Sequence, residues 1–79
     1  MNWQLLKNVN PPIGKVFVLF EKTTKDIYFA KRTETRGKII EYSQAYRKGD
    51  LEEYHYRMPY KEFKSEYGAN VYWSLFVKP

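Results

Sequence analysis

The sequence contains no cysteine and only one histidine among its 79 residues. Without cysteine the chain cannot form disulfides, and it has no thiolate ligand for a structural zinc ion. His55 alone cannot make a metal site of the usual kind, in which several histidine, cysteine or carboxylate ligands converge. We therefore expect no metal and no cofactor. The missing cysteines also fit a reducing compartment.

Long hydrophobic runs are missing as well. No apolar stretch approaches the ~20 residues that a helix needs to cross a bilayer. The first residues lack the basic stretch followed by an apolar stretch that marks a secretory signal peptide. The sequence thus predicts a protein without a membrane partner. Its length of 79 residues predicts one small domain, 1–79, of marginal stability.

Catalytic signatures are also absent from the sequence. It has no glycine-rich phosphate loop, and no serine has a recognisable base with an orienting acid. Glu52 and Glu53 are adjacent, so on a strand they point to opposite faces and cannot act as a carboxylate pair. We predict that the protein is not an enzyme. A small metal-independent nuclease or phosphodiesterase that uses His55 or Tyr46 is the alternative.

Aromatic rings and positive charge are what the sequence has in abundance. Phe, Trp and Tyr make up 19% of the chain, and the formal net charge is +5. Residues 1–48 carry a net charge of +6 (ten Lys/Arg, four Asp/Glu), whereas residues 49–79 carry −1 (four and five). Rings fill a small core efficiently, which explains most of them. The basic half predicts an anionic partner, unless the charge only keeps the protein soluble.

The pattern of side chains predicts an antiparallel meander over residues 15–58. Residues 15–22 are apolar on both faces, as in a central strand. A short polar link joins them to residues 26–34, which completes a hairpin. Residues 39–48 form the next strand. Residues 51–58 alternate tyrosine and methionine with charged residues, which is typical of a strand at a sheet edge.

The turn around Gly37 sets the register of the second hairpin. If Arg36 and Gly37 form a two-residue loop, Arg32 lies opposite Glu41 and Ile27 opposite Tyr46. Arg-Gly is not a preferred dipeptide for so tight a turn, so a longer loop is the alternative.

A short helix over residues 59–68 follows the meander. Pro59 suits the first helical position. Tyr60, Phe63 and Tyr67 are spaced three and four residues apart and so share one face. Gly68 is expected to end the helix in a left-handed conformation. Residues 70–78 form the closing strand. The predicted fold is α+β and mostly antiparallel: a curled sheet or half-barrel of about five strands with one short helix before the last.

The first fourteen residues form a separate pattern, "WQLLKNVNPPIG" at 3–14. Two prolines forbid a regular helix there and stiffen the chain. Gly14 then allows a turn into the first long strand. We interpret residues 1–14 as an N-terminal clip in which Trp3 packs over the sheet near Trp73.

The candidate binding site is a basic and aromatic strip along the second hairpin. Cations bind phosphates and aromatic faces stack on bases. The alternative is an ordinary solvated surface, in which cations protect sheet edges and tyrosines are half buried. The predicted ligand-binding residues are Tyr28, Lys31, Arg32, Arg36, Lys38, Tyr42, Tyr46, Arg47 and Lys48.

The two ends of the chain resemble a family of short phage and prophage proteins of unknown function. Members of that family open with a tryptophan, a proline eight residues on, a glycine three further, and then an apolar strand. Trp3, Pro11, Gly14 and "VFVLF" match this opening. The family closes on a strand with Thr-His-Trp-Met-Pro-Leu and a proline. Here the close is "VYWSLFVKP", in which Trp73 matches and the inner proline is missing.

The resemblance implies a phage accessory protein that acts in the cytoplasm of an infected bacterial host. Such proteins often work by binding, so we expect a non-catalytic binding protein that counters a host or defence function. The expected ligand is a signalling nucleotide or a nucleic acid. The alternative is a protein–protein inhibitor that docks on an acidic surface of a host enzyme. An edge strand and exposed aromatics would also allow a homodimer.

Overall fold

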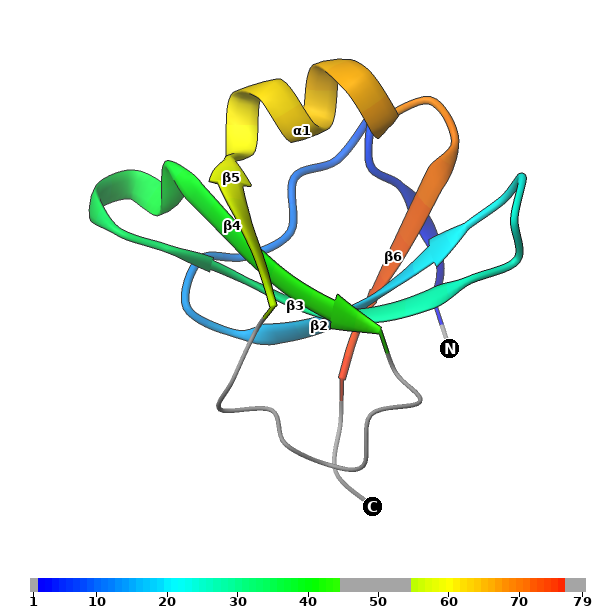
Figure 1. Ribbon diagram of the computed structural model, residues 1–79, viewed down its shortest axis with the longest axis horizontal. Coiled ribbons are helices and arrows are strands. Elements are labelled where there is room, and N and C mark those ends of the chain that lie inside the picture. The colour runs from blue at the N-terminus through cyan, green and yellow to red at the C-terminus, as the bar shows by residue number, and fades with distance from the viewer. Residues whose placement is uncertain (1, 45–54, 77–79) are drawn as a thin grey trace.

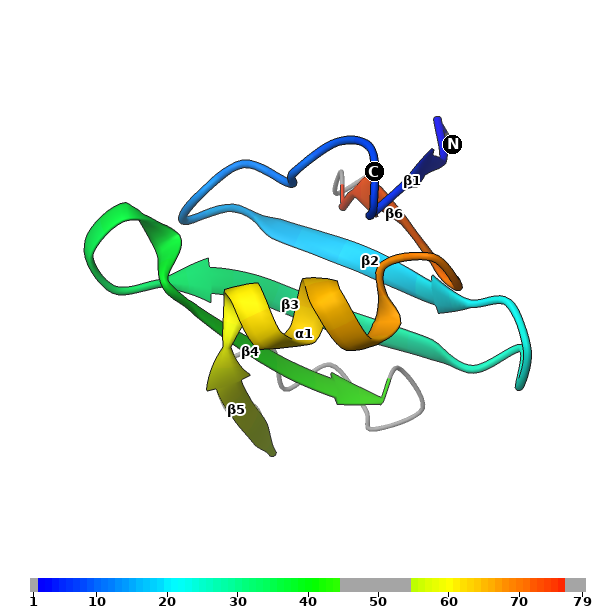
Figure 2. The same cartoon turned by 90° about the horizontal axis from the view of Figure 1, so that it is seen from above.

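A computed structural model describes residues 2–44 and 55–76 of the chain, which form one curled sheet and one α-helix (Figure 1). All strand pairs are antiparallel, and the strand order is β1-β6-β2-β3-β4-β5. Figures 1 and 2 show α1 lying over the hollow side of the sheet. The predicted α+β fold with a curled sheet and a helix before the last strand is therefore confirmed. The elements are β1 (Gln4–Leu5), β2 (Val16–Glu21), β3 (Ile27–Thr33), the 3-10 turn η1 (Thr35–Gly37), β4 (Ile39–Gln44), β5 (Tyr56–Pro59), α1 (Tyr60–Tyr67) and β6 (Val71–Leu75).

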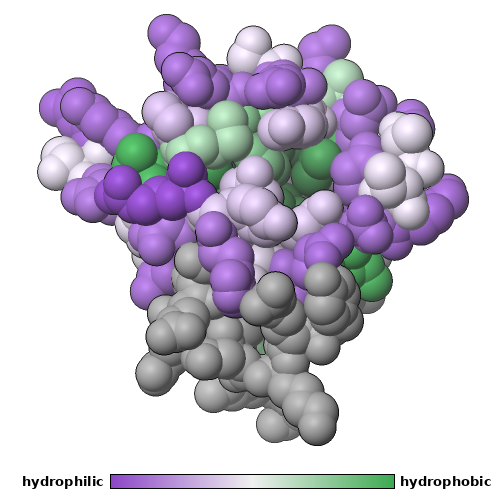
Figure 3. Space-filling model, viewed as in Figure 1, coloured by the Kyte–Doolittle hydropathy of each residue, from purple (hydrophilic) through white to green (hydrophobic). Residues whose placement is uncertain are grey.

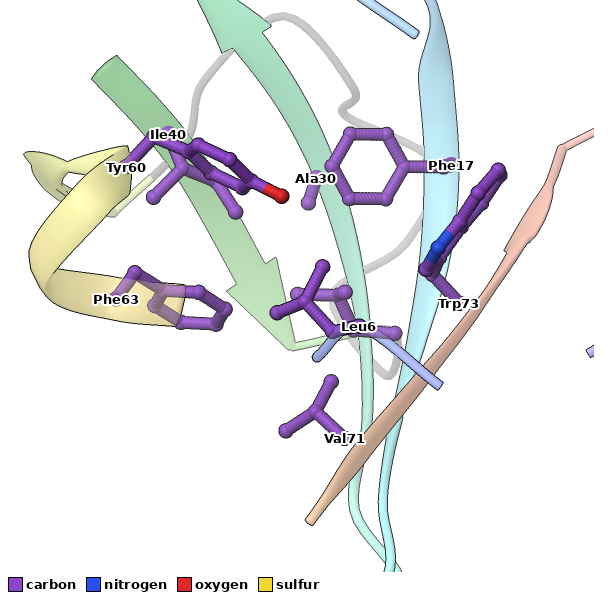
Figure 4. Close-up of a cluster of buried hydrophobic side chains, with 9 residues drawn as sticks. Leu6, Phe17, Ala30, Ile40, Tyr60, Phe63, Val71 and Trp73 are labelled. Carbon is purple, nitrogen blue, oxygen red and sulfur yellow. The ribbon is translucent and has the colours of Figure 1, made fainter. Parts of the chain in front are cut away.

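The hydrophobic core lies between α1 and the side of the sheet that faces it, which we call the inner face. Successive strand residues point to opposite faces, so Phe17 and Leu19 of β2 face inward while Val18 and Phe20 face outward. Tyr60 and Phe63 reach down from the helix toward this core (Figure 4). The buried core residues are Leu6, Phe17, Leu19, Ala30, Ile40, Tyr60, Phe63, Val71 and Trp73.

The register of the second hairpin differs by one residue from the two-residue loop that we considered. Arg32 pairs with Ile40 and Lys31 with Glu41, so Arg32 does not lie opposite Glu41. The connection is the longer alternative, because η1 and its flanking residues separate Thr33 from Ile39. A slip of one residue moves a side chain to the other face, and Glu41 accordingly accepts a hydrogen bond from Thr33 on the outer face (2.8 Å). The predicted pairing of Ile27 with Tyr46 lies outside the described residues.

The helix occupies Tyr60–Tyr67, one residue inside the predicted limits at each end. Pro59 is its N-cap and still pairs with Ile39, so it precedes the helix instead of opening it. Gly68 has φ −56°, which makes the predicted left-handed cap wrong. Glycine is needed there for space: an added Cβ would overlap the Lys64 carbonyl oxygen and lie 3.4 Å from Lys7 Cα.

The N-terminal segment completes the core from the side of β6. Leu6 is fully buried, and its amide donates to the Val71 carbonyl (2.9 Å). The indole nitrogen of Trp73 donates to the Val9 carbonyl (2.8 Å). The Tyr60 hydroxyl of α1 donates to Asn10 (2.8 Å). Residues 6–10 are thus tied to both the last strand and the helix.

Trp3 packs on the outer face, away from the core that holds Trp73. Its ring lies 6.1 Å from that of Phe20, and the two line a hollow together with Ile27 and Tyr72. Trp73 instead packs edge-on against Phe17 inside the core, with 6.1 Å between ring centroids. The pairing of Gln4 with Trp73 explains this separation, since Trp3 and its neighbour Gln4 point to opposite sides.

Candidate functional site: an aromatic cavity under the helix

A cavity of about 130 Å³ opens between α1 and the inner face of the sheet. In the view of Figure 3, hydrophobic and weakly polar residues gather below the helix, and hydrophilic residues surround them. Aromatic rings from strand and helix dominate the walls. The lining residues are Leu19, Glu21, Tyr28, Tyr42, Phe63, Tyr67 and Val71. We call this space the aromatic cavity.

The rings around the aromatic cavity meet at steep angles. Tyr28 and Tyr42 are nearly perpendicular, with 83° between their planes and 5.8 Å between centroids. Phe63 is tilted by 55° to Tyr42 and by 52° to Tyr67. Tyr56 of the edge strand stacks on Tyr42, with 5.1 Å between ring centroids and 22° between ring planes. Tyr28, Tyr42 and Phe63 therefore border the cavity from different directions, whereas Tyr42 and Tyr56 are nearly parallel and stacked on each other.

One carboxylate lines the aromatic cavity, and others act on its tyrosines. Glu21 lines it directly, and its carboxylate accepts a 2.6 Å hydrogen bond from the Thr24 amide. That backbone hydrogen bond lowers the pKa of Glu21, so the group is charged at neutral pH. Burial and then the charge of Asp26 raise the pKa of Tyr28. The described part of the site is therefore aromatic with an anionic side.

Burial is also the main cause of the raised pKa of Tyr42. Its tyrosine neighbours, Tyr67 first, and the Glu66 carboxylate raise this pKa further. Tyr28 and Tyr42 therefore keep their hydroxyl protons at neutral pH.

Arg32 belongs to the structural framework, although the sequence placed it in the ligand site. Its guanidinium lies over the Tyr60 ring at 3.9 Å from the centroid. It also donates to the Pro11 carbonyl (2.8 Å) and the Gly37 carbonyl (3.2 Å). These contacts join the N-terminal segment, η1 and α1, so the guanidinium is already engaged within the fold.

The other described members of the predicted strip are divided among different surfaces. Tyr28 and Tyr42 line the aromatic cavity together. Lys31 pairs with Glu41 on the outer face, because it alternates with Arg32 along β3. Arg36 and Lys38 are exposed at the turn that joins β3 to β4. Tyr46, Arg47 and Lys48 lie outside the described residues.

His55 lies next to a serine on the outer side of the sheet. The Ser43 hydroxyl and His55 Nδ1 are 2.8 Å apart, a pair that the sequence gave no reason to expect. Ser43 is only 7% exposed, which gives a substrate little access to its oxygen. The pair is therefore best explained as a buried hydroxyl that has found a hydrogen-bond partner.

The comparisons with known proteins add no relative to this picture: no family model, curated protein or solved structure matches the chain. Among residues 2–44 and 55–76, no group of three or more His, Cys, Asp or Glu side chains could hold a metal ion. In the same residues, no helix is long and apolar enough to span a membrane.

Part of the aromatic cavity could be found from the sequence and part could not. Tyr28 and Tyr42 were candidate residues, and the spacing of Phe63 and Tyr67 placed them on one helix face. That spacing is also typical of plain core packing. Glu21 gave no signal, because a carboxylate at the end of a strand usually faces solvent.

Proposed function

We propose that this is a phage-encoded, non-catalytic binding protein that counters a host or defence function, and that the aromatic cavity is its ligand site. The observation that carries the proposal is the cavity itself, which three tyrosines and Phe63 line on the hollow side of the sheet. Apolar concave spaces with a few polar groups are the usual places for ligands. The phage origin rests on the resemblance at the two ends of the chain.

The size of the aromatic cavity sets the size of the guest. Its volume of about 130 Å³ is close to that of an engineered cavity of about 150 Å³ that binds benzene. A guest of that size is one ring or one compact branched group. Tyr67 is 38% exposed, so a larger ligand or a partner chain could insert such a group from solvent.

Nuclear magnetic resonance of the tyrosine ring signals tests the ligand site. We expect a fragment library of single-ring and compact branched molecules to shift the signals of Tyr28, Tyr42 and Tyr67. Tyr67→Ala should abolish the shifts at Tyr28 and Tyr42, because it removes one wall of the cavity. The ring is 38% exposed, so its removal should have little effect on the core. Tyr72→Ala is the matched control, since Tyr72 lines the hollow on the outer face. Fragments that shift only signals elsewhere would refute the assignment.

A second candidate function, the binding of an anionic partner, is favoured by charge. Arg36 and Lys38 are exposed close together at the β3–β4 turn, in the half of the chain with a net charge of +6. Calorimetric titration with cyclic dinucleotides, DNA and RNA at low and moderate salt tests this candidate. Binding that is lost in an Arg36→Ala/Lys38→Ala variant but kept in Lys61→Ala would support it. No heat with any of these ligands would exclude the nucleotide and nucleic-acid forms.

An acidic host protein is the remaining form of that second candidate. A pull-down from host lysate treated with nuclease separates it from nucleic-acid binding. One stoichiometric protein partner, lost with the same double variant, is the expected result. Recovery of equal amounts of that partner with the variant would contradict docking through these cations.

A further inference from the structure

We infer that the aromatic cavity selects a compact organic cation, an alkylammonium group such as trimethylammonium, over a neutral or anionic guest of the same shape. This inference rests on the proposed ligand site and names the chemical class of its guest. It differs from the anionic ligand that the overall charge of the sequence predicts.

The first reason is the arrangement of the rings. Aromatic faces carry negative partial charge and attract a cation that lies within about 6 Å of the ring centroid. Tyr28, Tyr42 and Phe63 meet at 83° and 55°, so their surfaces border one volume from several sides. A roughly spherical ammonium group can contact all of them at once. A flat nucleobase would stack on an open ring face, and one face of Tyr42 is already covered by Tyr56.

The second reason is the charge around the rings. Glu21 lines the aromatic cavity and is held in its ionised form by the Thr24 amide. Asp26 and Glu66 lie close enough to act on Tyr28 and Tyr42 respectively. A cation in the cavity would be attracted by these carboxylates and by the rings together, whereas an anion would be repelled.

The third reason is that nearby basic side chains are engaged elsewhere. The Arg32 guanidinium contacts backbone carbonyls and the Tyr60 ring. The Lys64 ammonium donates to the side chain of Asn10 in the N-terminal segment of the chain (2.7 Å). The Lys25 ammonium lies 5.9 Å from the Phe20 ring, on the outer face. These three cations are therefore engaged away from the carboxylates at the cavity.

The test compares three guests of nearly equal shape by nuclear magnetic resonance titration of the full chain. They are tetramethylammonium, neutral tert-butanol and anionic pivalate. We expect tetramethylammonium to shift the ring signals of Tyr28, Tyr42 and Tyr67 and to bind about threefold to thirtyfold more tightly than tert-butanol. Pivalate should bind most weakly. Added salt should weaken the binding of tetramethylammonium only.

A pair of carboxylate variants separates the role of charge from that of stability. Glu21→Gln keeps an acceptor for the Thr24 amide but removes the charge at the cavity. Glu41→Gln does the same for an outer-face carboxylate that accepts from Thr33. We expect the first variant to weaken tetramethylammonium binding severalfold and the second to leave it unchanged. Equal effects of the two variants would overturn the inference.

The outcomes distinguish this inference from the proposed function. If tert-butanol or pivalate binds the aromatic cavity as tightly as tetramethylammonium, the cavity is a ligand site but does not select cations. If no guest and no library fragment shifts the cavity tyrosines, both proposals fail. Where tetramethylammonium does bind, titration with choline and with a trimethyllysine peptide, each compared with its unmethylated counterpart, distinguishes a small-molecule cation from a cation on a protein. Tighter binding of the peptide would show that the partner is a protein.

Discussion

Arg32 shows how strongly one residue's role depends on its surroundings. The same side chain would bind phosphate on an open surface, yet here it holds three segments of the chain together. Its planar fork donates to three backbone carbonyls while the flat guanidinium rests on Tyr60. A lysine could not do both, because its ammonium is a compact point charge.

Replacing Arg32 should therefore destabilise the fold. Arg32→Ala leaves the Pro11 and Gly37 carbonyls without their donor, which should lower the free energy of unfolding by about 2 to 3 kcal/mol. Urea denaturation measures the loss. Arg57→Ala is the control, because its ion pair with Glu34 is exposed on both sides (55% and 56%) and should cost no more than about 1 kcal/mol. Equal losses in the two variants would contradict a framework role for Arg32.

One buried and two partly buried tyrosines make the stability of the protein depend on pH in the alkaline range. Burial raises the pKa of Tyr28, Tyr42 and Tyr60 above the ordinary value of 10.0. A group whose pKa is raised on folding stabilises the protein fully below its unfolded pKa, and this contribution is lost as the pH rises through the folded pKa. We expect the contribution of these tyrosines to the free energy of unfolding to be constant below about pH 10 and to fall above it.

Urea denaturation from pH 8 to 11, with tyrosinate absorbance recorded in parallel, checks this expectation. Tyr42→Phe should reduce the alkaline loss, because phenylalanine has no proton to give up. Its hydroxyl makes only a long contact with the Met58 sulfur (3.9 Å), so the variant should stay folded at neutral pH. Rising stability above pH 10 would show that the sign is wrong.

At the scale of elements, α1 is positioned by what surrounds its two ends. Pro59 is both the last residue of the edge strand β5 and the residue that precedes the helix. Gly68 follows the helix where the N-terminal segment crosses, and the Lys7 amide donates to its carbonyl (3.0 Å). The helix is therefore held between β5 and the clip, and this position forms the roof of the aromatic cavity.

Gly68→Ala tests the close approach at the end of the helix. The added methyl would overlap the Lys64 carbonyl and crowd Lys7, so we expect a loss of about 1 to 3 kcal/mol in the free energy of unfolding. Differential scanning calorimetry would record it as a lower melting temperature. Gly14→Asn is the control: this position has φ +78° with nothing within 4 Å of an added Cβ, and asparagine tolerates that conformation. A stabilised Gly68→Ala variant would show that the space exists.

At the scale of the whole molecule, the N-terminal segment and the last strand complete the sheet and core together. β1 pairs with β6 only, and Leu6 contributes a fully buried side chain. The clip is thus part of the core, not a cover laid over it. Its prolines hold the chain extended, and Pro11 is itself buried beside the Arg32 contact.

Substitution of the two tryptophans compares packing on the outer face of the sheet, where Trp3 lies, with packing in the core, where Trp73 lies. Trp3→Ala removes a ring that is 40% exposed against Phe20 and should lower the free energy of unfolding by about 1 to 2 kcal/mol. Trp73→Ala opens a core cavity and should cost about 3 to 5 kcal/mol. Thermal unfolding followed by circular dichroism measures both. Trp3→Ala should still bind cavity ligands where it is folded; an unchanged melting temperature would contradict the role of the clip.

Much of the fold could be predicted from local patterns, but the site only in part. An apolar run placed β2, stretches of strand-forming residues on either side of Gly37 placed β3 and β4, and the spacing of Tyr60, Phe63 and Tyr67 placed α1. The position of the turn after β3 was predicted, but the sequence did not decide its length, since Glu34 and Arg36 adopt positive φ, which non-glycine residues rarely do. The structure divides the described residues of the strip among several surfaces, because lysine and arginine look alike in sequence whether they face solvent, the outer face or a backbone carbonyl.

The sequence by itself determined the class of fold, the helix, the central strand and the excess of rings and positive charge, because these follow from composition and from periods of two and about 3.6 residues. Only the tertiary structure decided which rings meet. It brought β3, β4 and α1 around one space, withdrew Arg32 into the framework and placed Glu21 at the cavity wall. The distances between side chains that are far apart in the sequence, and hence their electrostatic interactions, are set only when the sheet curls. The charge of the whole chain is positive, while the described surroundings of its aromatic cavity are negative.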